Sequence, residues 1–119
     1  MLSIEYVRIS ELAQHTWHRN PKEHATDDII ASMKRFGFTA PILFDETSGM
    51  MVAGHGRLEA ATALFEKREE IAAQLAALVE DGGESEVAQN LQGFNIHGLL
   101  IGTKQEDDGE WSLPVVKGL

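Results

Sequence analysis

Residues 50–61 constrain the fold of this chain more than any other stretch. A short apolar run from Met50 to Ala53 ends at Gly54, and a second glycine, Gly56, precedes a helix-forming segment that begins at about Arg57. An apolar run, a glycine turn and an amphipathic segment in this order predict a strand, a tight turn and a helix N-terminus. We therefore expect a strand end and a helix start to meet near the middle of the chain.

The predicted junction has the chemistry of an anion site. The first amides of a helix have no intrahelical acceptor, and the helix dipole adds positive potential around them. Glycines let an anionic group approach the backbone closely, and the Arg57 guanidinium suits phosphate or carboxylate. Most such junctions bind nothing, so a plain structural turn is the alternative. The stretch is not a P-loop, since no Gly-Lys-Ser/Thr follows, and its glycine spacing is not that of the dinucleotide fingerprint.

The composition limits the classes of protein to consider. The 119 residues suffice for one domain with a core, and the absence of cysteine excludes disulfides, thiolate nucleophiles and cysteine metal sites. The net charge of −9 argues against a broad duplex-DNA interface, although most basic residues lie in the first half and allow a local cationic pocket. No run is long enough to span a membrane and no signal pattern is present, so we expect a cytoplasmic protein without a membrane partner.

Strands and helices are predicted to be intermixed, which makes the fold class α+β with a small mixed sheet. The clearest helix takes Thr26 as its N-cap, carries two aspartates in its first turn and stops at Gly37. Beyond residue 57 the pattern fits either one helix to Val79 or two helices that meet in the charged stretch 66–70. Pro114 favours an edge or strand-end position in the last strand. The other predicted elements are strands over 4–9, 41–45, 50–53, 96–101 and 111–117, a hairpin turn at 45–49, a short helix over 85–91 and a polar turn over 105–110.

Four segments together resemble the ParB/sulfiredoxin-like superfamily. They are Arg19 to His24, the stretch from Ile30 through Phe36-Gly37-Phe38 to Leu43, Val52 to Ala61, and Leu113 to Val116. The nearest resemblance is to the ParB-like nuclease domains of phages and mobile elements, in which a Gly-His-Gly-Arg box precedes an alanine-rich helix. The likeness covers residues 4–65 and 111–117. Residues 1–119 are therefore predicted to form a single ParB-like domain with an insertion at about 66–110.

The resemblance implies an α+β fold with a nucleotide site, and ATP or CTP with Mg²⁺ as the cofactor. By position, the glycine-arginine box would contact phosphates, and the early motif would face the same pocket. Pro41 and the preceding Phe38-Thr39-Ala40 would form its nucleotide-side wall. His55 and Glu59 are the candidate catalytic residues, His55 as an acid–base group and Glu59 as a group that orients Arg57 or a magnesium-bound water. A turn histidine facing solvent and a structural glutamate are the alternatives. The predicted phosphate- or nucleotide-binding residues are Gly54, His55, Gly56, Arg57, Arg19, Asn20, His24 and Pro41.

Two departures from the family pattern shape the expected function. Sulfiredoxins place a cysteine in the box where this chain has His55, so sulfinic-acid reduction is excluded. The second nucleotide motif and the helix-turn-helix of the partition proteins are not evident. We therefore expect a nucleotide-binding domain in the DNA metabolism, partition or modification of a phage or mobile element. NTP hydrolysis stays open, and DNA is reached only indirectly or through a partner. The alternatives are a non-enzymatic adaptor that binds a protein partner through residues 66–110 and a metal-dependent DNA nuclease. The expected macromolecular partner is another protein or a second copy of the chain in a homodimer.

Three further features have structural and functional interpretations. His15 and His18 lie three residues apart, a spacing at which imidazoles can share zinc, but no metal site is predicted because their register is not fixed. Trp17 and Trp111 are expected in the core or at its rim rather than as base-stacking platforms. The apolar stripe over 71–79 is expected in the core, with a partner-facing helix as the alternative.

Overall fold

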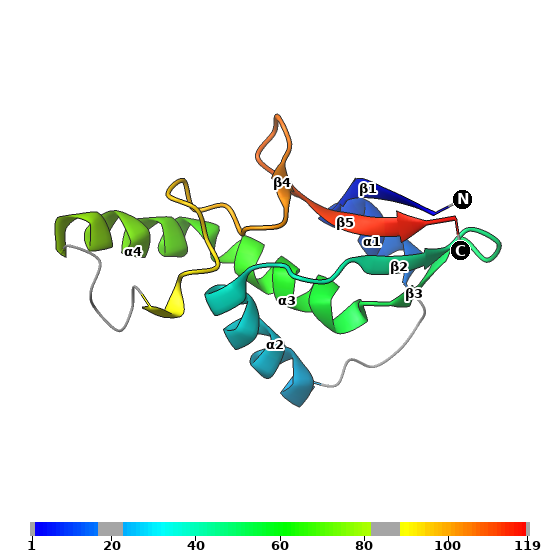
Figure 1. Ribbon diagram of the computed structural model, residues 1–119, viewed down its shortest axis with the longest axis horizontal. Coiled ribbons are helices and arrows are strands. Elements are labelled where there is room, and N and C mark those ends of the chain that lie inside the picture. The colour runs from blue at the N-terminus through cyan, green and yellow to red at the C-terminus, as the bar shows by residue number, and fades with distance from the viewer. Residues whose placement is uncertain (1, 17–22, 82–88, 119) are drawn as a thin grey trace.

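The structure is a computed structural model that describes residues 2–16, 23–81 and 89–118, with only the backbone described for 23–25 and 79–81. Strands and helices are intermixed, and the helices pack against a mixed sheet (Figure 1). The predicted α+β class is therefore confirmed. The strands are β1 (Ser3–Arg8), β2 (Ile42–Asp45), β3 (Met50–Ala53), β4 (Lys104–Gln105) and β5 (Trp111–Lys117); the helices are α1 (Ile9–Leu12), the 3₁₀ turn η1 (Ala13–His15), α2 (Glu23–Phe36), α3 (His55–Glu66) and α4 (Arg68–Asp81).

The last strand of the chain lies in the middle of the sheet. The strand order is β1-β5-β2-β3, with β4 also paired to β5. β5 runs antiparallel to β1 and parallel to β2, and β2 forms the predicted antiparallel hairpin with β3. Its side chains Trp111, Leu113 and Val115 are buried in the core. These buried side chains belong to every second residue of β5, so they share the face of the sheet that packs against the core.

Pro114 does not mark an edge strand, so that prediction is wrong. β1 pairs with β5 along its whole length, with Tyr6 opposite Pro114. The other edge of β5 is shared, because β4 pairs with Trp111 and Ser112 whereas β2 pairs with Val115 and Val116. Pro114 lies between these two ladders. Its missing N–H therefore falls where no strand on that edge requires a donor.

Helix α2 begins three residues before its predicted N-cap. It starts at Glu23, and because Glu23 and Ala25 are good helix formers the helix extends past Thr26 toward the N-terminus. Thr26 lies inside the helix, where its hydroxyl donates to a Glu59 carboxylate oxygen at 3.0 Å. The two aspartates that follow lie beyond the first turn. The Thr26 N-cap prediction is therefore wrong.

The stop predicted for α2 is found at Gly37, whereas the one predicted at Gly82-Gly83 lies outside the described residues. Gly37 has a left-handed φ of 83°, and its N–H donates to the Met33 carbonyl at 2.8 Å, which closes α2. The alternative of two helices after residue 55 is the correct one. α3 ends at Glu66, the N–H of its C-cap Lys67 donates to the Leu64 carbonyl at 3.1 Å, and α4 starts at Arg68. Ile71 at the start of α4 is buried, whereas Leu75 and Leu78 are partly buried against the core.

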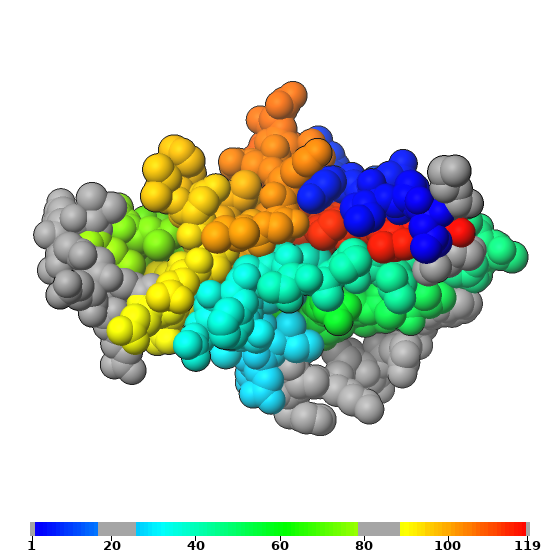
Figure 2. Space-filling model, viewed as in Figure 1, coloured from blue at the N-terminus to red at the C-terminus, as the bar shows by residue number. Residues whose placement is uncertain are grey.

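The strand predicted over 96–101 is not present. The chain there forms turns closed by one bridge between Phe94 and Leu100. The Asn95 side chain accepts the amides of His97 and Leu99, and Gly98 has a φ of 84°. An Asx turn followed by a left-handed glycine competes with an extended strand, which is why the apolar pattern was misleading. The polar turn over 105–110 is confirmed, and it projects from the body in Figure 2.

The helices leave part of the sheet open. In Figure 2, β1, β5 and β2 lie side by side on the face turned toward the viewer. The side chains of Ile4 and Tyr6 in β1 are exposed. On the core side, Phe65 of α3 packs edge-on against Trp111, which confirms the core position expected for this tryptophan. Trp17 and most of the helix predicted over 85–91 lie outside the described residues. Within the described ranges, no helix combines the length and apolar content needed to cross a bilayer.

Candidate functional site

The junction between β3 and α3 has the predicted strand–turn–helix form. Gly54 is the N-cap of α3 and has a left-handed backbone, with φ 102° and ψ 13°. A Cβ at this position would lie 2.9 Å from Cγ1 and 3.3 Å from Cα of the buried Ile42 on β2. Both the backbone conformation and the close approach to β2 therefore require glycine. The helix starts at His55, slightly earlier than the sequence suggested.

The first amides of α3 are uncapped among the described residues. The first intrahelical bond runs from the Leu58 N–H to the Gly54 carbonyl at 2.9 Å, and no described side chain caps the helix. The amides of His55, Gly56 and Arg57 precede that bond. Such amides, together with the dipole of a 12-residue helix, form a positive end that favours an anion.

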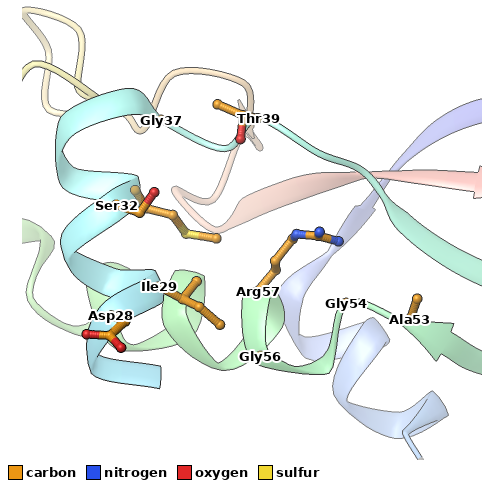
Figure 3. A pocket seen from close by; sticks show the side chains of 10 residues that line it. Asp28, Ile29, Ser32, Gly37, Thr39, Ala53, Gly54, Gly56 and Arg57 are labelled. Atoms are coloured by element: carbon orange, nitrogen blue, oxygen red, sulfur yellow. The ribbon is translucent and has the colours of Figure 1, made fainter. Parts of the chain in front are cut away.

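A pocket of about 500 Å³ opens at this helix end, between α3 and α2 (Figure 3). Ile29 reaches from α2 toward α3, and a Cβ on Gly56 would lie 2.7 Å from the Cδ1 atom of Ile29, so glycine lets the two helices approach closely. The volume falls in the range that holds small-molecule ligands and cofactors. The pocket is lined by Asp28, Ile29, Ser32 and Met33 of α2, Gly37 and Thr39 after it, and Ala53, Gly54, Gly56 and Arg57 at the junction.

Arg57 lines this pocket and has no carboxylate partner within the described part of the chain. Its side chain extends from the first turn of α3 (Figure 3), and Nη1 lies 3.5 Å from the Pro41 carbonyl, a long and weak contact. Pro41 is half-buried beside the guanidinium, whereas Thr39 rather than Pro41 lines the pocket itself. A guanidinium this weakly engaged keeps most of its donors for a ligand.

His55 and Glu59 have different surroundings. His55 is half-buried, so it is not the solvent-facing turn histidine of the alternative interpretation, and its Nε2 atom is buried without a hydrogen-bond partner among the described residues. Glu59 accepts the Thr26 hydroxyl and thereby ties α3 to α2. Neither side chain lines the pocket. The geometry thus gives Glu59 a structural contact and leaves His55 with an unused nitrogen.

The early motif cannot be placed. Arg19 and Asn20 lie outside the described residues, and of His24 only the backbone in α2 is described. His15 is engaged elsewhere, with Nδ1 3.0 Å from the Gly49 carbonyl and its ring edge-on to Phe44. His18 also lies outside the described residues. In the described part of the chain, no three His, Asp or Glu side chains are grouped so that they could share a metal ion.

The chain is similar in sequence to a known ParB-like protein. The ParB-like nuclease domain-containing protein YnaK of Escherichia coli (strain K12) is 39% identical to this chain over 66 residues, which cover 53% of the chain and 72% of YnaK. The chain belongs to the family of ParB-like domains. No protein-family model matches the chain, and no solved structure gives a significant match.

The ParB-like domain brings Gly54, Gly56 and Arg57 together at one pocket, whereas Pro41 lies beside Arg57 but does not line the pocket. Sequence reasoning did not single out the opposite wall of the pocket, where α2 presents Asp28 and Ser32. These two residues are four positions apart in a helix, so their side chains lie on the same face of it. That spacing was the available signal. Asp28 was instead interpreted as a residue that stabilises the helix start.

Proposed function

We propose that this ParB-like domain binds the phosphates of a nucleotide at the start of α3, in the DNA metabolism, partition or modification of a phage or mobile element. The observation that supports it is the pocket that is lined by both the N-terminus of α3 and Arg57. A chain with a net charge of −9 repels anions overall, so an anion needs such a local concentration of positive potential. The name of YnaK, a ParB-like nuclease domain protein, supports a role connected with DNA.

ATP or CTP with Mg²⁺ is the proposed ligand. The uncapped amides and the guanidinium suit phosphate oxygens. Mg²⁺ in nucleotide sites is held mainly by phosphate oxygens, water and one or two carboxylates, and Asp28 is the carboxylate on the pocket wall. Hydrolysis would need a group that handles a proton, and His55 is the candidate, because its Nε2 atom has no hydrogen-bond partner among the described residues. Its side chain does not line the pocket, so it would have to turn toward the ligand to act. Glu59 would have to leave Thr26 to act on a magnesium-bound water, so we assign it to helix packing.

Calorimetric titration with ATP, CTP, GTP and ADP, each with and without Mg²⁺, tests the proposal. Arg57→Ala should weaken binding by about 2 kcal/mol, or about thirtyfold in Kd, because it removes charged hydrogen bonds to phosphate. Arg35→Ala is the matched control, because Arg35 is exposed at the end of α2 and does not line the pocket. Equal affinities for wild type and Arg57→Ala would refute the site.

A non-enzymatic adaptor is the second candidate. The segment 66–110 exposes large apolar side chains, with Ile96 at 87% and Ile101 at 50% of their accessible surface. A partner could bury them. If none of the four nucleotides raises Tm in the presence of Mg²⁺, the adaptor becomes the better explanation; a clear increase would count against a vestigial pocket.

A nuclease is the third candidate, supported by the name of the relative. Its test is metal-dependent nicking of plasmid DNA by purified protein. Nicking that is present in the wild type and lost in His55→Ala would favour this function over the other two. Nicking that persists in the variant would point to a contaminating enzyme or to another site.

A further inference from the structure

We infer that residues 93–102 position the part of the pocket wall formed by Gly37 and Thr39, and that Gly102 is the positioning residue through which they act. The consequence for ligand affinity rests on the proposed function, whereas the positioning itself does not. Residues 93–102 belong to the segment predicted as an insertion, and none of them lines the pocket. Their effect on a ligand would therefore be exerted entirely through the backbone that they hold.

The contact point is Phe38, which lies between the two wall residues Gly37 and Thr39. Its N–H donates to the Ile101 carbonyl at 2.7 Å. Its own carbonyl packs directly against Gly102, where an added Cβ would lie only 2.3 Å from the Phe38 oxygen. Both peptide groups of Phe38 are thus held by adjacent residues of the 93–102 segment, and the side chain is buried in the core.

The same segment holds the end of α2. The Gly93 N–H donates to the Lys34 carbonyl at 2.7 Å, and a Cβ on Gly93 would lie 2.1 Å from the Met33 oxygen. The Gly93 carbonyl in turn accepts the Ile101 N–H at 2.8 Å. One continuous backbone network therefore joins the C-terminus of α2, the segment 93–102 and the wall that starts at Gly37.

This packing leaves no room for a side chain at Gly102. Ordinary van der Waals contact starts at about 3.4 Å, so a Cβ that would lie 2.3 Å from the Phe38 oxygen must push that carbonyl by about 1 Å. Binding sites need their groups held within about 0.5 Å. A methyl group at Gly102 should therefore distort the wall without entering the pocket.

Gly102→Ala compared with Gly109→Ala tests the inference. The two glycines have nearly the same φ, 94° and 92°, so both variants bear the same backbone strain, but nothing lies within 4 Å of a Cβ at Gly109. In ¹⁵N–¹H spectra of the ligand-free proteins, Gly102→Ala should shift the amides of Gly37 and Thr39, whereas Gly109→Ala should leave them unchanged. With ATP or CTP and Mg²⁺, Gly102→Ala should bind about tenfold more weakly than Gly109→Ala.

The outcomes separate the inference from the proposed function. Unchanged wall amides in a folded Gly102→Ala protein, or wall shifts equal to those of Gly109→Ala, would overturn the inference. If the wild type binds no nucleotide, the proposed function fails, but the ligand-free spectra still decide the positioning role. Shifted wall amides together with an unchanged Kd would also overturn the claim that this segment positions the site.

A second measurement applies if Gly102→Ala does not fold. Native-state hydrogen exchange of the wild type should give the amides of Phe38, Gly93 and Ile101 one common opening free energy, because they belong to a single network. An amide of Phe38 that exchanges independently of Gly93 would overturn the inference.

Discussion

Gly54→Ala is the substitution that most sharply tests the geometry of the β3–α3 junction. Gly54 combines a left-handed φ of 102° with contact to the buried Ile42. A left-handed conformation costs an L-residue about 1–2 kcal/mol. Placing a methyl 2.9 Å from Cγ1 of Ile42 adds overpacking of about 1–2 kcal/mol, because the neighbour belongs to a central strand and cannot move freely. We expect a total loss of about 3 kcal/mol.

Gly49→Ala is the control that isolates the packing contribution. Gly49 also has a positive φ, 71°, but nothing lies within 4 Å of an added Cβ. This variant should therefore lose only the backbone contribution of about 1–2 kcal/mol. Urea unfolding monitored by circular dichroism gives both free energies of unfolding, and in thermal scans Gly54→Ala should lower Tm by about 10 °C. If the two variants agree within about 0.5 kcal/mol, the tight packing of the junction against β2 is wrong.

Two further predictions concern contacts that hold the scaffold together, one between α2 and α3 and one between β1 and the turn over 105–110. Thr26→Val should reduce the free energy of unfolding by about 1 kcal/mol, because it removes the 3.0 Å hydrogen bond to Glu59 that joins α2 to α3. In a protein that already carries Glu59→Ala, Thr26→Val should have almost no effect. Full additivity in that double-mutant cycle would contradict the contact. Where β1 ends, the Arg8 guanidinium lowers the pKa of Asp108 below its ordinary 3.8. Hydrogen bonds from the Ser10 side chain, the Ser10 amide and Arg8 lower the pKa of Glu110 below 4.5. A carboxyl whose pKa is lower in the folded state stabilises the protein at pH values above its unfolded pKa, and this stabilisation is lost as the pH falls through the folded pKa. At pH values below about 4.5, Tm should therefore decrease, and the decrease should be smaller in Arg8→Ala. An identical acid limb in Tm profiles of both proteins between pH 2.5 and 6 would show that the Arg8 contacts do not form.

The sequence predicted those parts of the fold that short-range physics determines. The β2–β3 hairpin, the glycine stop of α2 and the strand–turn–helix at Gly54 each depend on a few adjacent residues with strong backbone preferences. The position of Arg57 in the candidate pocket followed from the same local pattern, since a helix starting after Gly54 carries that side chain in its first turn.

The errors arose where a distant segment decides the outcome. Pro114 is tolerated in a central strand only because two different strands share one edge of β5 and leave a gap at that residue. Thr26 was assigned to a cap, but the helix extends beyond it and its hydroxyl instead meets Glu59, 33 residues later. The far wall of the pocket comes from the packing of α2 on α3, which no local pattern specifies.

The most direct measurement of the central claim is a ¹⁵N–¹H titration that compares a nucleoside triphosphate with its unphosphorylated nucleoside, in the presence of Mg²⁺. If phosphate binds the uncapped end of α3, the amides of His55, Gly56 and Arg57 should move most, and only with the triphosphate. Equal responses to the two compounds, or shifts confined to residues far from this helix start, would contradict the account.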